Sequence, residues 1–411
     1  MRLLKFIGVF LAVFIVIAAI IILPSLKSVR TIIKNYDTLD EGSQWLQQIS
    51  TTEGFLNYIE AHPKRVSIYS YTPGQADSTL DYHGETSRSV GTLSVLVSVA
   101  AYAHLVGTGR WQPDELIPLD SVNHYQLPGV FSSAHLKNLS ALPKTKTGQP
   151  MIQLNQLVRM AVQGQDLAAA DYLYWKIGPA RLDSTLSNLA INNLEAPLPW
   201  TGLYITMNPD VNHEEANLLL KNFARKDRKK QRQIIIDNSR RFNEDPAFHN
   251  LVIKAFREKG TGLSFAQERT AYSFLPKATA RSLVELVRKA WTDSLYDQNT
   301  SKIFLKTLQW RDMVPLMKHV FSWYGSSFDN RMSLLSGVDV GTTTRFGYTR
   351  IQAMVLDSLP IQLWFHLSSQ FSNQTLERRL IWDPTFYRTA YNRLILHKTV
   401  IDSMVINTQP G

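Results

Sequence analysis

The chain has 411 residues, 44% of them hydrophobic, and a formal net charge of +10. This composition can bury a large core, which excludes an intrinsically disordered chain. The absence of cysteine excludes disulfides, a lipidated cysteine anchor, thiolate metal sites and a cysteine nucleophile.

The N-terminus has the features of a membrane anchor. Phe6 to Leu23 form an uninterrupted run of 18 apolar or glycine residues. As a helix rising about 1.5 Å per residue, this run nearly spans a hydrocarbon core of about 30 Å. The apolar core of a cleavable signal peptide is shorter, about 7–15 residues, and ends at a small-x-small site. The stretch from Leu23 to Lys27 has no such site, so we predict that residues 1–24 are an uncleaved transmembrane helix.

Residues 25–60 are predicted to form an amphipathic helical stem. β-forming residues then alternate from Arg65 to Tyr71, and a turn at Pro73-Gly74 leads back through Thr79 to Tyr82. This pattern predicts a β-hairpin. The stretch from Leu93 to Val106 is apolar on nearly every face, which predicts a central, buried helix.

Helices dominate the middle of the chain. One or two helices are predicted from Leu154 to Ile177, and a clean amphipathic helix from Ala278 to Trp291. Near the end, Gln352–Leu356 and Ile361–Phe365 flank a short turn and predict a second hairpin, followed by a last helix from Pro384 to Leu396. Strands near both ends with helices between them predict an α/β (α+β) fold, in which one antiparallel sheet from both chain ends carries an inserted all-helical lobe.

The order of strand, turn, strand and buried helix from Arg65 to Val106 resembles the opening of class A β-lactamases and related penicillin-recognising serine enzymes. Further segments resemble that family in the same order: Trp111–Glu115, Ile152–Gly178, Leu275–Ala280 and Gly341–Thr343. The resemblance implies a β-lactamase/transpeptidase-like domain over residues 61–411.

The chemistry of that family depends on three motifs. A Ser-x-x-Lys at the head of the central helix places a lysine one turn from the nucleophilic serine. A Ser-Asp-Asn loop supplies a hydroxyl and an amide to the substrate. A Lys-Thr-Gly strand binds the substrate carboxylate and lines the pocket.

All three motifs are altered in this chain. The resemblance places Gly91 to Ser94, Gln165 to Leu167 and Asp339 to Gly341 at their positions. A literal Lys-Thr-Gly at Lys146 to Gly148 lies in a Pro-rich loop without strand character, and we interpret it as a coincidence. The predicted degenerate pocket comprises Gly91, Thr92, Ser94, Gln165, Asp166, Asp339, Gly341 and Thr342.

Three serines crowd the start of the central helix: Ser87, Ser89 and Ser94. One hypothesis is a rearranged nucleophile with His83 or His104 as its base. The other is helix capping, because serine oxygens satisfy the free N–H groups of a helix start.

Residues 201–270 are predicted to be a basic helical insertion. Between Lys221 and Gly260, twelve Lys and Arg stand against five Asp and Glu, so this stretch carries +7 of the net +10. It is either a solvated helical hairpin or a surface for anionic lipid headgroups, an anionic envelope polymer or an acidic protein. The candidate contact residues are Lys229, Lys230 and Arg232.

These features favour a membrane-anchored, β-lactamase-like protein of the bacterial cell envelope, with its main domain on the periplasmic side of the inner membrane. Because the catalytic motifs are altered, a non-catalytic binding or scaffolding protein is the first hypothesis. An active serine hydrolase with non-standard residues is the second, and a purely structural membrane protein the third. The histidines show no metal-ligand spacing, so we expect no metal or cofactor. No nucleic-acid motif occurs, so we expect no such partner.

Overall fold

The computed structural model describes most of the globular part of the chain. The described residues are 33, 35–75, 79–130, 132–140, 142, 150–308, 326–328, 337–345, 348–370 and 372–396. The predicted anchor, residues 1–24, lies outside them. Among the described residues, no helix is both long enough and apolar enough to cross a membrane.

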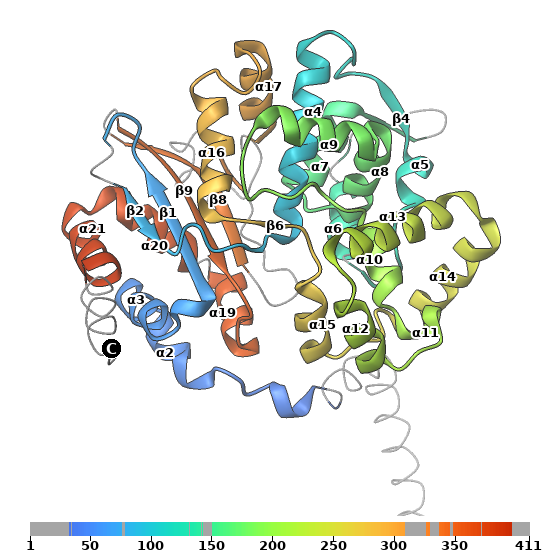
Figure 1. Cartoon of the computed structure of the whole chain (residues 1–411), viewed down its shortest axis with the longest axis horizontal. Coiled ribbons are helices and arrows are strands. Elements are labelled where there is room, and N and C mark those ends of the chain that lie inside the picture. The colour runs from blue at the N-terminus through green and yellow to red at the C-terminus, as the bar shows by residue number, and fades with distance from the viewer. Residues whose placement is uncertain are drawn as a thin grey trace, which may run out of the picture.

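A five-stranded antiparallel sheet draws its strands from both ends of the described chain (Figure 1). The strands are β1 (Val66–Tyr71), β2 (Leu80–Tyr82), β7 (Ser326–Phe328), β8 (Gly337–Arg345) and β9 (Tyr348–Leu356), in the spatial order β2-β1-β9-β8-β7. β1 pairs with β2 in the predicted hairpin and with β9 on its other side, where Ile68 lies opposite Met354. The predicted sheet from both chain ends is therefore confirmed.

The predicted second hairpin is wrong. β9 pairs with β8, and the expected partner strand, Ile361–Phe365, is the start of helix α19 (Ile361–Gln370). Pro360 precedes this helix, and its carbonyl accepts the first helical hydrogen bond (2.9 Å). Proline favours a helix start because its φ is already helical and it has no N–H to satisfy. Leu363 and Leu367, one turn apart, are both buried, so the apolar spacing is helical.

One face of the sheet is covered by α3 (Thr52–Ala61), α20 (Ser372–Trp382) and α21 (Pro384–Tyr391), on the left of Figure 1. The apolar residues of α3 share one core with the sheet. The end of the predicted stem, residues 25–60, is therefore part of the domain rather than a separate element. The other face packs against α16 (Ala280–Trp291), the predicted amphipathic helix.

The helical lobe is built around α4 (Val95–Gly107), which is buried along most of its length, as its uniform apolarity predicts. It is contacted by α7 (Leu154–Val162), α8 (Leu167–Ile177), α9 (Pro179–Leu189) and α17 (Gln298–Leu308). α7 and α8 confirm the helices predicted in that stretch.

The remaining elements are shorter or belong to the insertion. They are β3 (Arg88–Ser89) paired with β6 (Lys277–Ala278), β4 (Leu116–Pro118) paired with β5 (Met151–Gln153), α2 (Leu46–Ile49), α5 (Leu119–Asn123), α6 (Ser132–Ser140), α10 (Trp200–Met207), α11 (Pro209–Asn212), α12 (Ala216–Ala224), α13 (Arg228–Glu244), α14 (Pro246–Lys259) and α15 (Phe265–Tyr272). There are 3₁₀ turns at Tyr36–Thr38, Ser43–Trp45, Pro63–Arg65 and Gly91–Ser94, and a π-helical turn over Asn392–Leu396 extends α21 as predicted.

The predicted insertion, residues 201–270, is a layer of helices with its own buried face. α10 is buried along its whole length. Gly202 lets it approach α13 closely, since a Cβ at this position would lie 2.0 Å from the carbonyl oxygen of Ile235. α13 directs Ile235 and Phe242 inward and keeps its Lys and Arg on the more exposed side. The insertion is therefore packed onto the helical lobe and is not a free hairpin.

Candidate functional site

The turn into α4 is where the family resemblance implies a nucleophile. The Val90 N–H donates to the Pro276 carbonyl (3.0 Å) beside the β3–β6 pair, which holds the start of the turn. The 3₁₀ turn Gly91–Ser94 then continues into α4. Gly91 is buried and has φ +52°, a conformation that favours glycine over serine. The backbone thus accounts for the glycine, and this position offers no hydroxyl.

Ser94 lies where the resemblance implies a lysine. It is only 3% exposed. Neither the 3₁₀ turn nor α4 has a side-chain cap, so the structure does not support the capping interpretation for Ser94. Ser89 lies in β3, where its carbonyl accepts a hydrogen bond from the Tyr272 hydroxyl (2.9 Å), and Ser87 is exposed. The three serines therefore occupy three different environments.

The two histidines considered as bases are held by other parts of the fold. His104 lies ten residues after Ser94, a distance of about 15 Å along a helix. Its ring stacks on Tyr296, with centroids 4.2 Å apart. His83 follows β2, and its ring packs edge-on against Tyr82 (4.5 Å). His104 is thus too far along α4 to take a proton from Ser94.

The second altered motif lies at the start of α8. Asp166 caps this helix by accepting from the Ala169 N–H (3.0 Å), and its carboxylate also accepts from Asn138 Nδ2 (3.2 Å) and lies 2.8 Å from His135 Nδ1. Gln165 has φ +48° and is 2% exposed. Within the described residues, its Nε2 has no hydrogen-bond partner. Asp166 therefore has a structural role, whereas the side-chain nitrogen of Gln165 is buried without a hydrogen bond to a described residue.

His135 is the member of this cluster that the sequence analysis missed. Its Nε2 lies 3.0 Å from Asn123 Oδ1, so the ring links α5, α6 and α8. A histidine held by an aspartate is also the base of a catalytic triad. Here both ring nitrogens are engaged, and no serine among the described residues is hydrogen-bonded to the ring. The arrangement is a buried polar network.

Replacing Asp166 by alanine is expected to lower the free energy of unfolding by about 2–4 kcal/mol, because α8 loses its cap, and the buried His135 and the half-buried Asn138 each lose a partner. Gln165→Gly is expected to be neutral or stabilising by up to about 1 kcal/mol. Glycine accepts the positive φ and removes the unpaired amide. Urea unfolding of both variants tests this, and a large loss in Gln165→Gly would contradict the assignment of its amide as unpaired.

The third altered motif lies on β8, between β7 and β9. This strand carries the predicted residues Asp339, Gly341 and Thr342. Val340 is fully buried and belongs to the same hydrophobic core as Leu93 and Leu167. The fold therefore brings the segments of all three altered motifs to one core. The literal motif at Lys146 to Gly148 lies outside the described residues.

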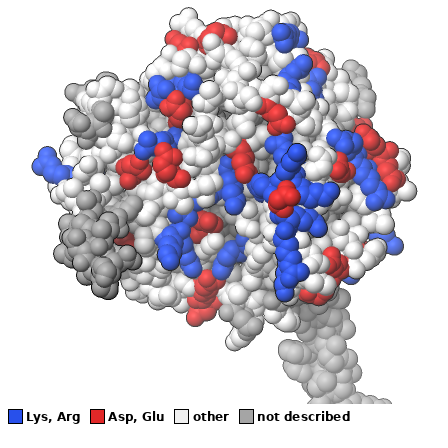
Figure 2. Space-filling view, viewed as in Figure 1, with Lys and Arg blue, Asp and Glu red and all other residues white. Residues whose placement is uncertain are grey.

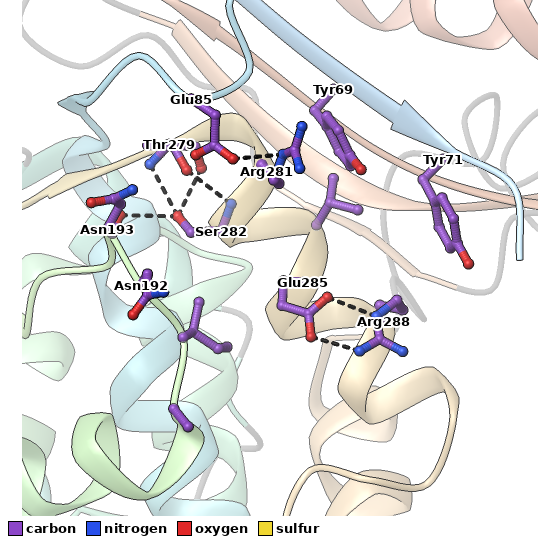
Figure 3. Close-up of a pocket in the computed structure, with 13 residues that line it drawn as sticks. Tyr69, Tyr71, Glu85, Asn192, Asn193, Thr279, Arg281, Ser282, Glu285 and Arg288 are labelled. Atoms are coloured by element: carbon purple, nitrogen blue, oxygen red, sulfur yellow. Dashed lines mark hydrogen bonds and ion pairs between the residues drawn. The ribbon is translucent and has the colours of Figure 1, made fainter. Parts of the chain in front are cut away.

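A hollow of about 450 Å³ opens beside α16 and contains none of the predicted pocket residues (Figure 3). Tyr69 and Tyr71 of β1 line one side of it. α16 lines a second side, and the loop of residues 190–193 lines the third. This site has no signal in the sequence, because its residues come from three distant parts of the chain.

The hollow is polar but nearly neutral. Its ion pairs are Arg281 with Asp81 and Glu85, and Arg288 with Glu285. Arg281 also lies over the ring of Tyr69, 4.9 Å from its centroid. Partial burial raises the pKa of Tyr69 above its ordinary value, so its hydroxyl remains protonated. Such a hollow suits an uncharged polar ligand, which does not leave a buried charge unpaired.

Asp171 of α8 anchors the first helix of the insertion. Its buried carboxylate accepts from the backbone N–H groups of Trp200 (2.6 Å) and Thr201 (2.7 Å). These N–H groups belong to the first turn of α10, where a helix leaves its donors unpaired. Burial raises the pKa of Asp171 to about 7, and the hydrogen bonds partly oppose this shift. Asp171 therefore acts as a buried cap that joins the lobe to the insertion.

Among the described residues, no group of three or more histidine, aspartate or glutamate side chains is placed to hold a metal ion. The expectation of a protein without metal or cofactor stays a prediction.

The chain is similar in structure to several solved β-lactamases. A β-lactamase from Sphaerobacter thermophilus DSM 20745 matches with a TM-score of 0.50 and 14% identity, over 81% of this chain and 95% of that chain. Two others are a β-lactamase from Francisella tularensis (TM-score 0.46, 11% identity, 80% and 100% covered) and the chromosome-encoded β-lactamase of Vibrio parahaemolyticus (0.46, 13%, 80% and 98%).

No family model and no curated protein sequence matches this chain. The similarity is therefore one of structure, and at these identities it defines the fold alone. The chain has a β-lactamase-like fold, which confirms the resemblance noted in the sequence.

Proposed function

We propose that this chain is a non-catalytic binding or scaffolding protein of the bacterial cell envelope, anchored in the inner membrane with its main domain in the periplasm. The observation that carries the proposal is Gly91. It stands at the head of the central helix, buried and with a positive φ, where the family resemblance implies a nucleophilic serine. A catalytic role would need another nucleophile in its place.

Ser94 is a poor replacement for that nucleophile. A hydroxyl attacks efficiently only when a base takes its proton. Ser94 itself occupies the position implied for the lysine, and it is buried. Asp166 of the second altered motif and His135 form an acid–base pair, but they are engaged with each other and with structural partners.

Binding is supported by the hollow beside α16. Its walls combine the Tyr69 and Tyr71 side chains with paired charges, and they offer hydrogen bonds without an activated group. An uncharged polar portion of an envelope polymer fits this chemistry.

The anchor in this proposal rests on the apolar run from Phe6 to Leu23. N-terminal sequencing of the mature protein, extracted from membranes, is expected to begin at or near Met1, because the run lacks a cleavage site. A mature chain that begins after residue 24 would show that the run is a removed signal peptide.

The alternative is an active serine hydrolase that uses non-standard residues on an envelope peptide or amide. The hydroxyls of Thr92 and Ser94 at the head of α4 are the observation in its favour. We expect steady-state hydrolysis of a chromogenic β-lactam and of a D-alanyl peptide to match the uncatalysed rate. Turnover above that rate, removed by Ser94→Ala or Thr92→Ala in a variant that still folds, would establish the alternative.

A further inference from the structure

The basic residues of the insertion divide into paired and unpaired cations. The ion pairs are Arg228 with Glu195, Arg232 with Asp183, Arg240 with Asp237, Arg241 with Asp245, and Lys259 with Asp210. The cations without an ion pair among the described residues are Lys221, Arg225, Lys226, Lys229, Lys230, Lys254 and Arg257. Only the second set has charge that is free to attract a partner.

Five of these unpaired cations surround one turn, and we call them the α12–α13 basic surface: Lys221, Arg225, Lys226, Lys229 and Lys230. All five are exposed. Figure 2 shows Lys and Arg side chains gathered over α12 and α13. The acid inside this turn, Asp227, caps α13 by accepting from the Lys230 N–H (2.8 Å), and it offsets only part of the charge.

The described chain begins near α12, at the end of this helix that lies away from the basic turn. The Asn35 side chain accepts a hydrogen bond from the Phe265 N–H at the start of α15 (2.7 Å). α15 in turn packs on α12, where Gln267 donates to Asn217 (2.9 Å). Figure 1 shows α12 and α15 at the bottom of the domain, at the end opposite the C-terminus of α4. The described chain therefore begins beside α15, which packs on α12.

The predicted anchor lies a short distance upstream. Residues 24–34 separate the apolar run from Asn35, and fully extended they reach about 40 Å at most. A domain tethered at this distance stays close to the bilayer surface. Because the described chain begins beside α15 and α12, we expect these two helices to be the part of the domain nearest the anchor. Attraction between charges extends over about 10 Å at 0.1 M salt, so a short tether makes weak surface contacts effective.

We propose that the α12–α13 basic surface docks on anionic lipid headgroups of the membrane that holds the anchor, and so orients the domain. This inference rests on the proposed anchor. A bilayer is favoured over a soluble polyanion because the cations lie on the outside of α12 and α13, and α12 packs on α15, where the described chain begins. Each cation near an anionic membrane strengthens attraction by about fivefold, so three of them together contribute about a hundredfold.

The test uses the full chain in liposomes. Because the chain has no cysteine, Ala224→Cys, exposed at the end of α12, gives a unique site for a fluorescent donor, with an acceptor dye in the lipid. Energy transfer is expected to be higher with phosphatidylglycerol than with phosphatidylcholine alone. It should fall as salt rises from about 0.05 M to about 0.5 M. A donor at Gln112→Cys, just beyond the far end of α4, should show little transfer in either lipid.

Charge reversal identifies the residues. The triple variant Arg225→Glu, Lys226→Glu and Lys229→Glu is expected to lower transfer to the value in neutral liposomes. A matched control with the same change in charge is the triple variant Arg240→Glu, Arg241→Glu and Lys254→Glu, away from the α12–α13 turn, and it should keep the transfer of the parent chain.

The outcomes separate the docking from the anchor. Equal transfer in both lipids, with the chain still floating on neutral liposomes, would overturn the docking and leave the anchor. Flotation only on anionic liposomes, lost in the first triple variant, would support the docking and overturn the anchor. Flotation on neither would overturn both. Binding to inorganic polyphosphate that depends on the same residues, without lipid-dependent transfer, would assign the surface to a soluble polyanion and overturn the lipid partner.

Discussion

Full-length protein incubated with a fluorescent penicillin is expected to show no covalent adduct on a denaturing gel. In the family that this chain resembles, the adduct forms when a serine at the head of the central helix, assisted by a lysine, attacks the lactam carbonyl. Here Gly91, where the resemblance implies the serine, has no side-chain oxygen, and Ser94 stands where the resemblance implies the lysine. Asp339 stands where a cation for the substrate carboxylate is implied.

The expected effect is large because the serine hydroxyl, the lysine that assists it and the cation for the substrate carboxylate are all missing at the positions that the resemblance implies. Each is typically worth about 10²–10⁴-fold in rate, so acylation should fall below detection. A β-lactamase with an intact Ser-x-x-Lys on the same gel is the positive control. An adduct that disappears in Ser94→Ala or Thr92→Ala would refute the non-catalytic proposal.

Restoring the first motif alone, by Gly91→Ser with Ser94→Lys, is not expected to produce an adduct, because Gln165 and Asp339 remain altered. The positive φ at Gly91 costs a serine about 1–2 kcal/mol, and a lysine at the buried position 94 loses its hydration. Gly91→Ala separates the backbone strain from the chemistry. Thermal melts of each variant show whether a missing adduct reflects chemistry or unfolding.

Asp171→Ala is expected to be the most destabilising single substitution proposed for this protein, at about 3–5 kcal/mol. The carboxylate satisfies two buried N–H groups, those of Trp200 and Thr201. Each costs about 1–3 kcal/mol when left unpaired. The control is Asp183→Ala, which removes a half-exposed aspartate paired with Arg232 and should cost less than about 1 kcal/mol. Equal losses in the two variants would contradict the anchoring role of Asp171.

The same carboxyl is expected to make stability depend on pH. Its pKa is raised to about 7 in the folded protein, so the folded state holds the proton more tightly than the unfolded state. The stabilisation that this protonation adds to the free energy of unfolding is therefore full below about pH 4. It is lost as pH rises to about 7, at up to about 1.4 kcal/mol per pH unit. The difference in free energy of unfolding between the parent protein and Asp171→Asn should fall over this range. A difference that rises with pH would mean a lowered pKa.

Regular patterns in the sequence were enough for much of the fold. The alternation from Arg65 to Tyr71 and the uniform apolarity from Leu93 to Val106 predicted β1 and α4. These patterns are local, because a strand repeats every two residues and a buried helix has no polar face. The short apolar segment Ile361–Phe365 was predicted as a strand and is helical. Five residues fit either period, and β9 is paired on both sides, with β1 and with β8, so it has no free edge for another strand.

For the candidate site, too, some features follow from the sequence and others only from the tertiary structure. The sequence by itself determined that glycine, serine and aspartate stand at Gly91, Ser94 and Asp339, where the family resemblance implies a serine and two lysines, because residue identity does not depend on folding. Only the tertiary structure decided which charges are free and which polar groups are satisfied. Arg232, one of the candidate contact residues, pairs with Asp183, 49 residues away. Lys229, on the same helix, has no ion pair among the described residues. The strength of an ion pair and the cost of a buried polar group both depend on distances between side chains in the folded protein. The spacing of residues along the sequence does not give these distances.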